Sequence, residues 1–204
     1  YYQVAGGRDI GFLKNEQEIT RIMHEAYEAK TPIVSEVRHR AILWGVQAQY
    51  YSAFPAWLQN CWGIQPLIDM LSLTSTEIYS EDDKEQAYYD MADLYAKENM
   101  RNRSEGGYQV GVEDLWRFCE EFRADVVIMY EHIACKAMTG YHGLFEEEGR
   151  KHGVHVIWVP HDLMDPRTVS REEMRQSVNQ YMRTILHEEP LDPSLESIDD
   201  GEAW

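Results

Sequence analysis

Short apolar runs alternate with segments of helical pattern through most of this sequence of 204 residues. The runs are residues 41–46 (AILWGV), 67–71 (LIDML), 125–130 (DVVIMY) and 154–159 (VHVIWV). A continuous apolar run of this length is typical of a strand that is buried on both faces. Because right-handed crossovers place the intervening helices on both faces, the alternation predicts a covered parallel sheet.

Helical periodicity and helix-ending residues mark the segments between these runs. We expect helices at 16–30, 54–62, 82–100, 112–122, 141–152 and from Ser170 onwards. Ser170 is followed three residues later by a glutamate, which matches the capping-box pattern of a helix start. The expected fold is an α/β, flavodoxin-like (Rossmann-like) three-layer domain whose four-stranded parallel sheet has the order 2-1-3-4.

The same pattern divides the chain into three expected parts. Residues 1–38 are expected to be a helical linker from a preceding domain that the sequence lacks, because Tyr1 opens what reads as a mid-chain stretch. Residues 39–188 carry the alternating pattern of the α/β domain. Residues 189–204 are acidic and contain proline, and we expect them to form a surface strap.

Charge and composition narrow the class of function. The formal net charge of −17 disfavours binding to nucleic acid or to anionic lipid, both of which need a basic surface. No apolar run is long enough to span a bilayer, and no secretory signal opens the chain. Three cysteines without a CxxC pair do not form a disulfide framework, so we expect a reducing, cytoplasmic setting.

Polar residues follow the third and fourth apolar runs, where the ligands of open α/β sheets bind. His132 and Cys135 come after the third run, and His161 and Asp162 come after the fourth. We expect these four side chains to share one crevice at the carboxyl end of the sheet. The start of the next helix and the neighbouring Lys136 would favour the thiolate form of Cys135, which metals require.

Each candidate also has a purely structural interpretation, which the pattern leaves open. Cys61 and Cys119 lie on predicted helices and are expected to be core residues, since free cysteines are often buried as small apolar side chains. The two histidines could be structural residues. Asp162 and Asp165 could cap the turn before the last helix.

The ACKAM segment at 134–138, the PHDLMDPR segment at 160–167 and the helix after it resemble the second domain of 2-hydroxyacyl-CoA dehydratase subunits. Benzoyl-CoA reductase subunits share this architecture. The resemblance extends over about residues 40–186. It departs at 176–177, where many members have Thr-Arg and this chain has Gln-Ser, and in the loop 46–51.

The resemblance implies that Cys135 ligates a [4Fe–4S] cluster whose other cysteines lie in a domain that this sequence lacks. It implies an oxygen-sensitive, anaerobic enzyme in which an ATP-dependent activator protein supplies a low-potential electron to a CoA thioester, giving a ketyl radical. A homologous second subunit would complete a heterodimer. Within this picture His132 or His161 is the expected proton donor, Asp162 orients it or positions the last helix, and Arg167 meets a CoA phosphate.

Other functions remain open at this stage. Reduction of the aromatic ring of benzoyl-CoA is the alternative to dehydration of a 2-hydroxyacyl-CoA, and a non-catalytic partner subunit of the same fold is another. An unrelated flavodoxin-like binding domain is disfavoured, because no phosphate-binding loop rich in Ser, Thr and Gly follows the first run. The cobalamin motif DxHxxG and the dinucleotide motif GxGxxG are also absent from the sequence.

Overall fold

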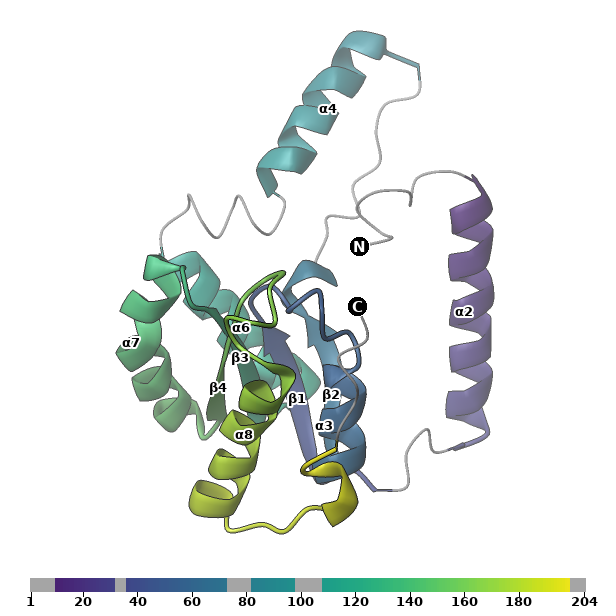
Figure 1. Ribbon diagram of the computed structural model, residues 1–204. Helices are drawn as coiled ribbons and strands as arrows, with labels where there is room; N and C mark the ends of the chain where they lie inside the picture. The colour runs from purple at the N-terminus through teal and green to yellow at the C-terminus, as the bar shows by residue number, and fades with distance from the viewer. Residues whose placement is uncertain (1–9, 32–35, 73–81, 98–107, 199–204) are drawn as a thin grey trace. The chain divides into compact units, whose positions relative to one another are not determined.

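The computed structural model describes residues 10–31, 36–72, 82–97 and 108–198 (Figure 1). The parallel strands are β1 (His39–Trp44), β2 (Ile64–Asp69), β3 (Val126–His132) and β4 (His155–His161). They form one four-stranded sheet in the order β2-β1-β3-β4. Both the parallel direction and the strand order predicted from the sequence are confirmed.

Helices cover both faces of this sheet, which confirms the flavodoxin-like three-layer fold (Figure 1). On one face lie α3 (Phe54–Trp62) and α8 (Arg171–Tyr181), and on the other lie α6 (Tyr108–Phe122) and α7 (Lys136–His152). Each pair of helices shares a buried apolar cluster with alternate residues of the strands. The sheet is therefore buried on both faces, as its continuous apolar runs indicated.

The structure also describes two further α-helices and three short helical turns. They are α2 (Ile10–Glu28), α4 (Lys84–Lys97), the 3-10 helices η1 (Met70–Ser72) and η3 (Pro193–Leu195), and the π-helix η2 (Met182–Leu186). The chain divides into two compact units, Tyr1–Glu36 and Val37–Trp204, and α2 belongs to the first. Within the described residues, no helix is both long and apolar enough to cross a membrane.

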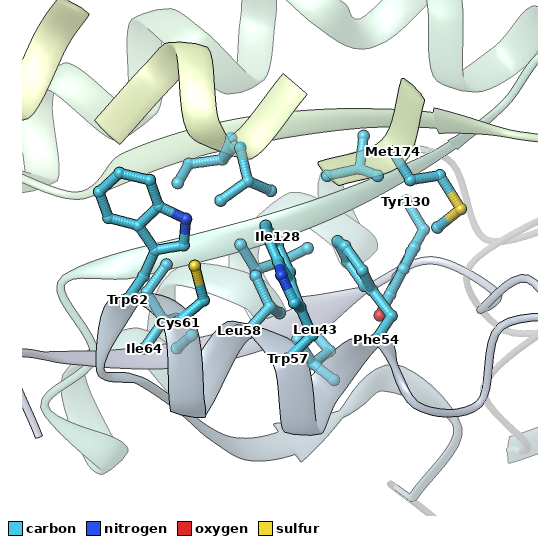
Figure 2. Close-up of a cluster of buried hydrophobic side chains, with 14 of the residues drawn as sticks. Leu43, Phe54, Trp57, Leu58, Cys61, Trp62, Ile64, Ile128, Tyr130 and Met174 are labelled. Atoms are coloured by element: carbon cyan, nitrogen blue, oxygen red, sulfur yellow. The ribbon is translucent and has the colours of Figure 1, made fainter. Parts of the chain in front are cut away.

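The cluster beneath α3 and α8 is the larger part of the core, and Figure 2 shows its centre. Phe54, Trp57 and Cys61 of α3 lie there with Tyr130 of β3 and Met174 of α8. The phenyl ring of Phe54 stacks on Trp57, with ring centroids 5.5 Å apart. Full burial of Phe54 and of Met174 contributes roughly 1.5–3 kcal/mol each to folding.

The predicted helices exist, and the bounds of several of them differ. The helix expected at 16–30 runs from Ile10 to Glu28. The helix expected at 112–122 begins at Tyr108, and the one expected at 141–152 begins at Lys136. The helix expected at 82–100 runs from Lys84 to Lys97, and residues 98–100 lie outside the described residues. Helix α3 matches its expected bounds and ends at Gly63, whose φ of 70° is a left-handed conformation that glycine adopts without a steric penalty.

The predicted bounds of the first two strands are wrong. β1 ends at Trp44 rather than at residue 46, because Gly45 turns the backbone to a φ of 100°. β2 spans Ile64–Asp69 rather than 67–71 and includes Pro66, a residue that an edge strand tolerates. The pairing register of β1 with β2 shifts next to Pro66.

The predicted bounds of the last two strands, 125–130 and 154–159, are also wrong. β3 extends to His132 and β4 to His161, and these two residues are paired in the sheet. The sequence predicts that both histidines lie in loops, because they interrupt the apolar pattern of the strands. Pairing between the two strands overrides that pattern, so both histidines lie at the ends of strands.

Helix α8 begins as its capping box predicts. The Ser170 side chain accepts a hydrogen bond from the backbone N–H of Glu173, and the Glu173 carboxylate accepts one from the backbone N–H of Ser170. The last helix therefore starts at a fixed point directly after the loop that follows β4.

His39, the first residue of β1, lies between two carboxylates at the amino end of the sheet. Its Nδ1 is 2.8 Å from Oδ2 of Asp125, and its Nε2 is 2.9 Å from Oε1 of Glu188. With a carboxylate at each nitrogen, the ring serves as a donor on both sides. The hydrogen bond to Asp125 raises the pKa of His39, burial opposes that shift, and Glu188 adds to it.

The segment 188–198, here called the C-terminal strap, is bound closely to the α/β domain. The backbone N–H of Leu191 donates to the carbonyl of Cys61 at 2.7 Å. The Trp57 indole donates to the carbonyl of Leu195, and Arg175 donates to that of Ile198, each at 2.8 Å. Within the described residues, the strap thus completes the α3 side of the core.

Replacement of His39 tests the ionic link between the strap and the sheet. We expect His39→Gln to lower the free energy of unfolding by about 2–4 kcal/mol at pH 6, because two carboxylates lose a charged donor. A raised folded pKa gives stability that is full below the unfolded value of about 6.5 and is lost as pH rises through the folded value. Urea denaturation should therefore show a smaller deficit at pH 9 than at pH 6.

The matched control is His24→Gln, at an exposed position of α2. It should leave the denaturation midpoint unchanged at both pH values. A His39→Gln deficit of equal size at pH 6 and pH 9 would show that protonation of His39 does not stabilise the fold.

Candidate functional site

Loops that follow β1, β3 and β4 meet at the carboxyl end of the sheet (Figure 1). The backbone N–H of Gln49 donates to the carbonyl of Leu163 at 2.9 Å, which joins the first loop to the third. The backbone N–H of Ile133 donates to the carbonyl of His161 at 3.0 Å, which joins the second loop to β4. The predicted meeting of these segments at the switch point of the sheet is therefore present.

Gly45 allows β1 and β3 to approach closely at this end. A Cβ atom at Gly45 would lie 2.6 Å from the carbonyl oxygen of Tyr130, and the φ of 100° is itself unfavourable for other residues. Any larger residue would force the two strands apart just where the loops begin.

His132 and His161 form a pair of imidazoles at the carboxyl ends of β3 and β4. Their ring centroids are 5.7 Å apart with an interplanar angle of 81°. The ring of His132 is half-buried, and its Nδ1 accepts a hydrogen bond from the backbone N–H of Ala134 at 3.0 Å. In its neutral form His132 therefore carries its proton on Nε2.

His161 is fully buried, and among the described residues neither of its ring nitrogens has a hydrogen-bond partner. Burial lowers the pKa of His161, and the nearby His132 lowers it further, against weaker opposition from the backbone of Val159, Val46 and Glu131. Buried polar atoms without partners are uncommon and costly. His161 is therefore neutral at physiological pH and is held in place by the fold.

Tyr130 belongs to the same buried group, although sequence reasoning did not select it. Its ring meets that of His161 edge-on at 5.7 Å, and its hydroxyl has no hydrogen-bond partner among the described residues. Burial raises the pKa of the Tyr130 hydroxyl, and the charge of Asp69 adds to the effect. The sequence does contain one indication of its place: Tyr130 lies two residues before His132, and this spacing puts the two side chains on the same face of a strand.

Asp162 and Asp165 shape the loop after β4. Oδ1 of Asp162 accepts hydrogen bonds from the backbone N–H groups of Met164 and Asp165, each at 2.8 Å. These two bonds lower the pKa of Asp162, and the nearby His132 contributes. Asp162 therefore stabilises the turn, which is the structural role that the sequence left open. Its charge also lies near the His132 ring.

Arg167, the predicted contact for a CoA phosphate, forms an ion pair with Asp165. Its Nε and Nη2 donate to the two carboxylate oxygens at 2.8 and 2.7 Å. Arg167 holds the pKa of Asp165 down at about 2. The Arg167 side chain is 86% exposed, so its remaining N–H groups face solvent.

Cys135 is the N-cap residue of α7 and is partly exposed. Its backbone N–H donates to the carbonyl of His132 at 2.8 Å, and its side chain makes no capping hydrogen bond. The described part of the chain contains no group of three or more His, Cys, Asp and Glu side chains arranged to hold a metal ion. The structure brings His132, His161 and Asp162 together, and Cys135 adjoins them through the backbone of His132.

The other two cysteines are core residues, as expected from the sequence. Cys61 and Cys119 are both buried. Burial raises the pKa of each thiol to about 12. Neither forms the thiolate that a metal requires at neutral pH.

Comparison with known proteins gives one family match. The chain is similar over residues 9–185 to the family described as 2-hydroxyglutaryl-CoA dehydratase, D-component. No curated protein matches the chain significantly. The matched region includes all four strands and the loops at their carboxyl ends.

His161→Leu tests whether the buried imidazole serves a purpose other than stability. Leucine removes two polar atoms without partners at similar volume, so we expect the free energy of unfolding at pH 7.5 to stay the same or to rise by about 1 kcal/mol. A lowered folded pKa means that stability is full above about pH 6.5 and is lost as pH falls through the folded value. The advantage of the variant should therefore grow between pH 7 and pH 5.

Thermal unfolding of both proteins across this pH range measures the difference. His24→Gln serves again as the exposed control and should follow the wild-type curve. A His161→Leu curve that runs parallel to wild type at every pH would mean that the wild-type imidazole titrates normally.

Proposed function

The chain belongs to the 2-hydroxyglutaryl-CoA dehydratase D-component family, and we propose that it is the iron–sulfur subunit of an enzyme that dehydrates a 2-hydroxyacyl-CoA thioester. The family match covers most of the chain and supports a dehydratase-type component. It favours dehydration over ring reduction of benzoyl-CoA, because the matched family is a dehydratase family.

The position of Cys135 carries the proposal. It is the one cysteine of the chain that is not buried, and it lies where the ligands of such sheets bind. A thiolate at this position fits the chemistry of an iron ligand, since [4Fe–4S] clusters are held by cysteine thiolates. One thiolate cannot hold four irons, so the other ligands would come from outside this chain.

We therefore assign residues 39–188 as the domain that presents one ligand to a cluster. Residues 1–38 would connect it to the part of the enzyme that holds the others, and residues 189–204 would be the tail. A bound cluster would supply the low-potential electron that reduces the thioester to a ketyl radical, with an ATP-dependent activator protein as its source. A homologous second subunit would complete the enzyme.

The residues of this chain would bind the thioester and move a proton. His132 is the proposed proton donor to the departing hydroxyl group, because its ring is partly open to solvent and Nε2 carries the proton. Asp162, whose charge lies near that ring, would keep it oriented. His161 is fully buried and neutral, so its role would be to pack against the His132 ring and limit the movement of that ring.

Arg167 would meet a phosphate of CoA with the N–H groups that its ion pair with Asp165 leaves exposed. The same ion pair would hold the guanidinium in one orientation. A phosphate would then bind without displacing the structural contact of the loop.

Cys135→Ser in the complete enzyme should reduce its iron content and its broad visible absorption, because the hydroxyl is a poor ligand for iron. Iron analysis and the absorption spectrum of the anaerobically purified protein measure this. Cys61→Ala and Cys119→Ala are the matched controls, and both should retain wild-type iron. Unchanged iron stoichiometry in Cys135→Ser would refute the assignment of this ligand.

His132→Gln should lower the turnover number about 100-fold or more while iron content stays at the wild-type level, since general acids contribute roughly 10²–10⁴ in rate. Turnover is measured with the activator protein, ATP and the 2-hydroxyacyl-CoA substrate. His161→Ala, tested separately, should have a smaller effect. Near-wild-type turnover in both variants would place proton transfer elsewhere in the enzyme.

A further inference from the structure

Four large apolar side chains of the described α/β domain, outside α4, are exposed to solvent, and two of them are at the candidate site. Ile133 is 45% exposed and directly follows β3, and Met164 is 63% exposed in the loop after β4. The other two, Val37 and Ile185, are at the opposite end of the sheet, before β1 and after α8. Exposed apolar residues are therefore found at the edge where a ligand would bind.

The backbone N–H of each of the two residues at the site donates a hydrogen bond, so neither lies on an unanchored loop. The N–H of Ile133 donates to the carbonyl of His161 at 3.0 Å, and the N–H of Met164 donates to Oδ1 of Asp162 at 2.8 Å. His161 and Asp162 are adjacent in sequence, so the two apolar residues are anchored to neighbouring points. Ile133 directly follows His132 in the chain, and Met164 lies in the loop that begins with Asp162, whose charge is near the His132 ring.

The charges around this pair disfavour a second carboxylate on the ligand. Segments 131–136 and 161–167 contain three carboxylates and two cations: the acidic residues are Glu131, Asp162 and Asp165, and the basic residues are Lys136 and Arg167. Arg167 is paired with Asp165, and its remaining N–H groups are the proposed contact of a CoA phosphate rather than of the acyl group. Residues 45–53, in the loop after β1, carry no charge, and Asp69 adds a carboxylate at the end of β2.

We propose that Ile133 and Met164 contact the acyl chain of the thioester, and that this enzyme prefers an uncharged hydrocarbon acyl group to one that ends in a carboxylate. The inference rests on the proposed function, which places a CoA thioester at this edge. The backbone of both residues is hydrogen-bonded in place, and their exposed side chains would give a hydrocarbon chain an apolar surface to bury. The excess of negative charge would repel a terminal carboxylate, as a glutaryl group carries.

Binding of thioesters that cannot turn over tests this without the activator. Isothermal titration of the assembled enzyme with hexanoyl-CoA, acetyl-CoA, glutaryl-CoA and free CoA compares the acyl groups directly. In the wild type we expect hexanoyl-CoA to bind at least tenfold more tightly than glutaryl-CoA. This comparison needs no variant and so does not depend on the folding of one.

The double variant Ile133→Thr/Met164→Gln should weaken hexanoyl-CoA binding about tenfold and leave acetyl-CoA and free CoA within about twofold, because only the longer chain reaches the pair. The matched control Ile185→Thr removes an apolar side chain whose exposure, 54%, lies between those of Ile133 and Met164, at the opposite end of the sheet. It should leave all four affinities unchanged.

Three results would overturn the inference while leaving the proposed function intact. They are tighter binding of glutaryl-CoA than of hexanoyl-CoA, an equal loss for all thioesters in the double variant, and dissociation of the double-variant enzyme into subunits. The last result would assign Ile133 and Met164 to a subunit interface. If the wild-type enzyme binds no CoA thioester at all, the proposed function fails, and this inference fails with it.

Discussion

The pairing of β3 with β4 is the interaction on which the candidate site depends. It runs from Val126 opposite His155 to His132 opposite His161, so it fixes the two imidazoles side by side at the end of the sheet. Both strands are buried among apolar side chains along most of their length, which prevents a shift in register. A slip of one residue would move His161 to the other face and separate it from His132 and Tyr130.

The histidines at the two ends of the sheet have opposite pKa shifts. At the amino end, His39 lies between two carboxylates, and its raised pKa favours the charged ring. At the carboxyl end, His161 has no partner among the described residues, and its lowered pKa favours the neutral ring. The first arrangement fastens the C-terminal strap to the core, whereas the second leaves polar atoms unsatisfied at the place where a ligand would bind. Unsatisfied buried groups are expected where function outweighs stability.

Burial distinguishes the two structural cysteines from the one that is a candidate metal ligand. Cys61 and Cys119 lie in the two apolar clusters, where burial keeps them protonated. Cys135 lies at the start of α7, beside the backbone of His132 and within the region matched by the dehydratase family. One thiolate cannot hold four irons, so the proposed cluster would need further ligands from outside the 204 residues of this sequence.

The sequence by itself determined the fold class, the order of the strands, the buried cysteines and the capping of α8. These follow from apolar periodicity, from the connection rules that apply to alternating strands and helices, and from contacts between near neighbours. It did not determine where β3 and β4 end. Glu131, His132, Pro160 and His161 carry no apolar signal, and they are strand residues only because each strand supplies hydrogen-bond partners to the other. The burial of His161, the unsatisfied hydroxyl of Tyr130 and the ion pairs of His39 likewise join residues far apart in the chain. Tertiary structure decided these features, because long-range pairing and desolvation depend on which segments meet in space, and no local pattern in the sequence records that.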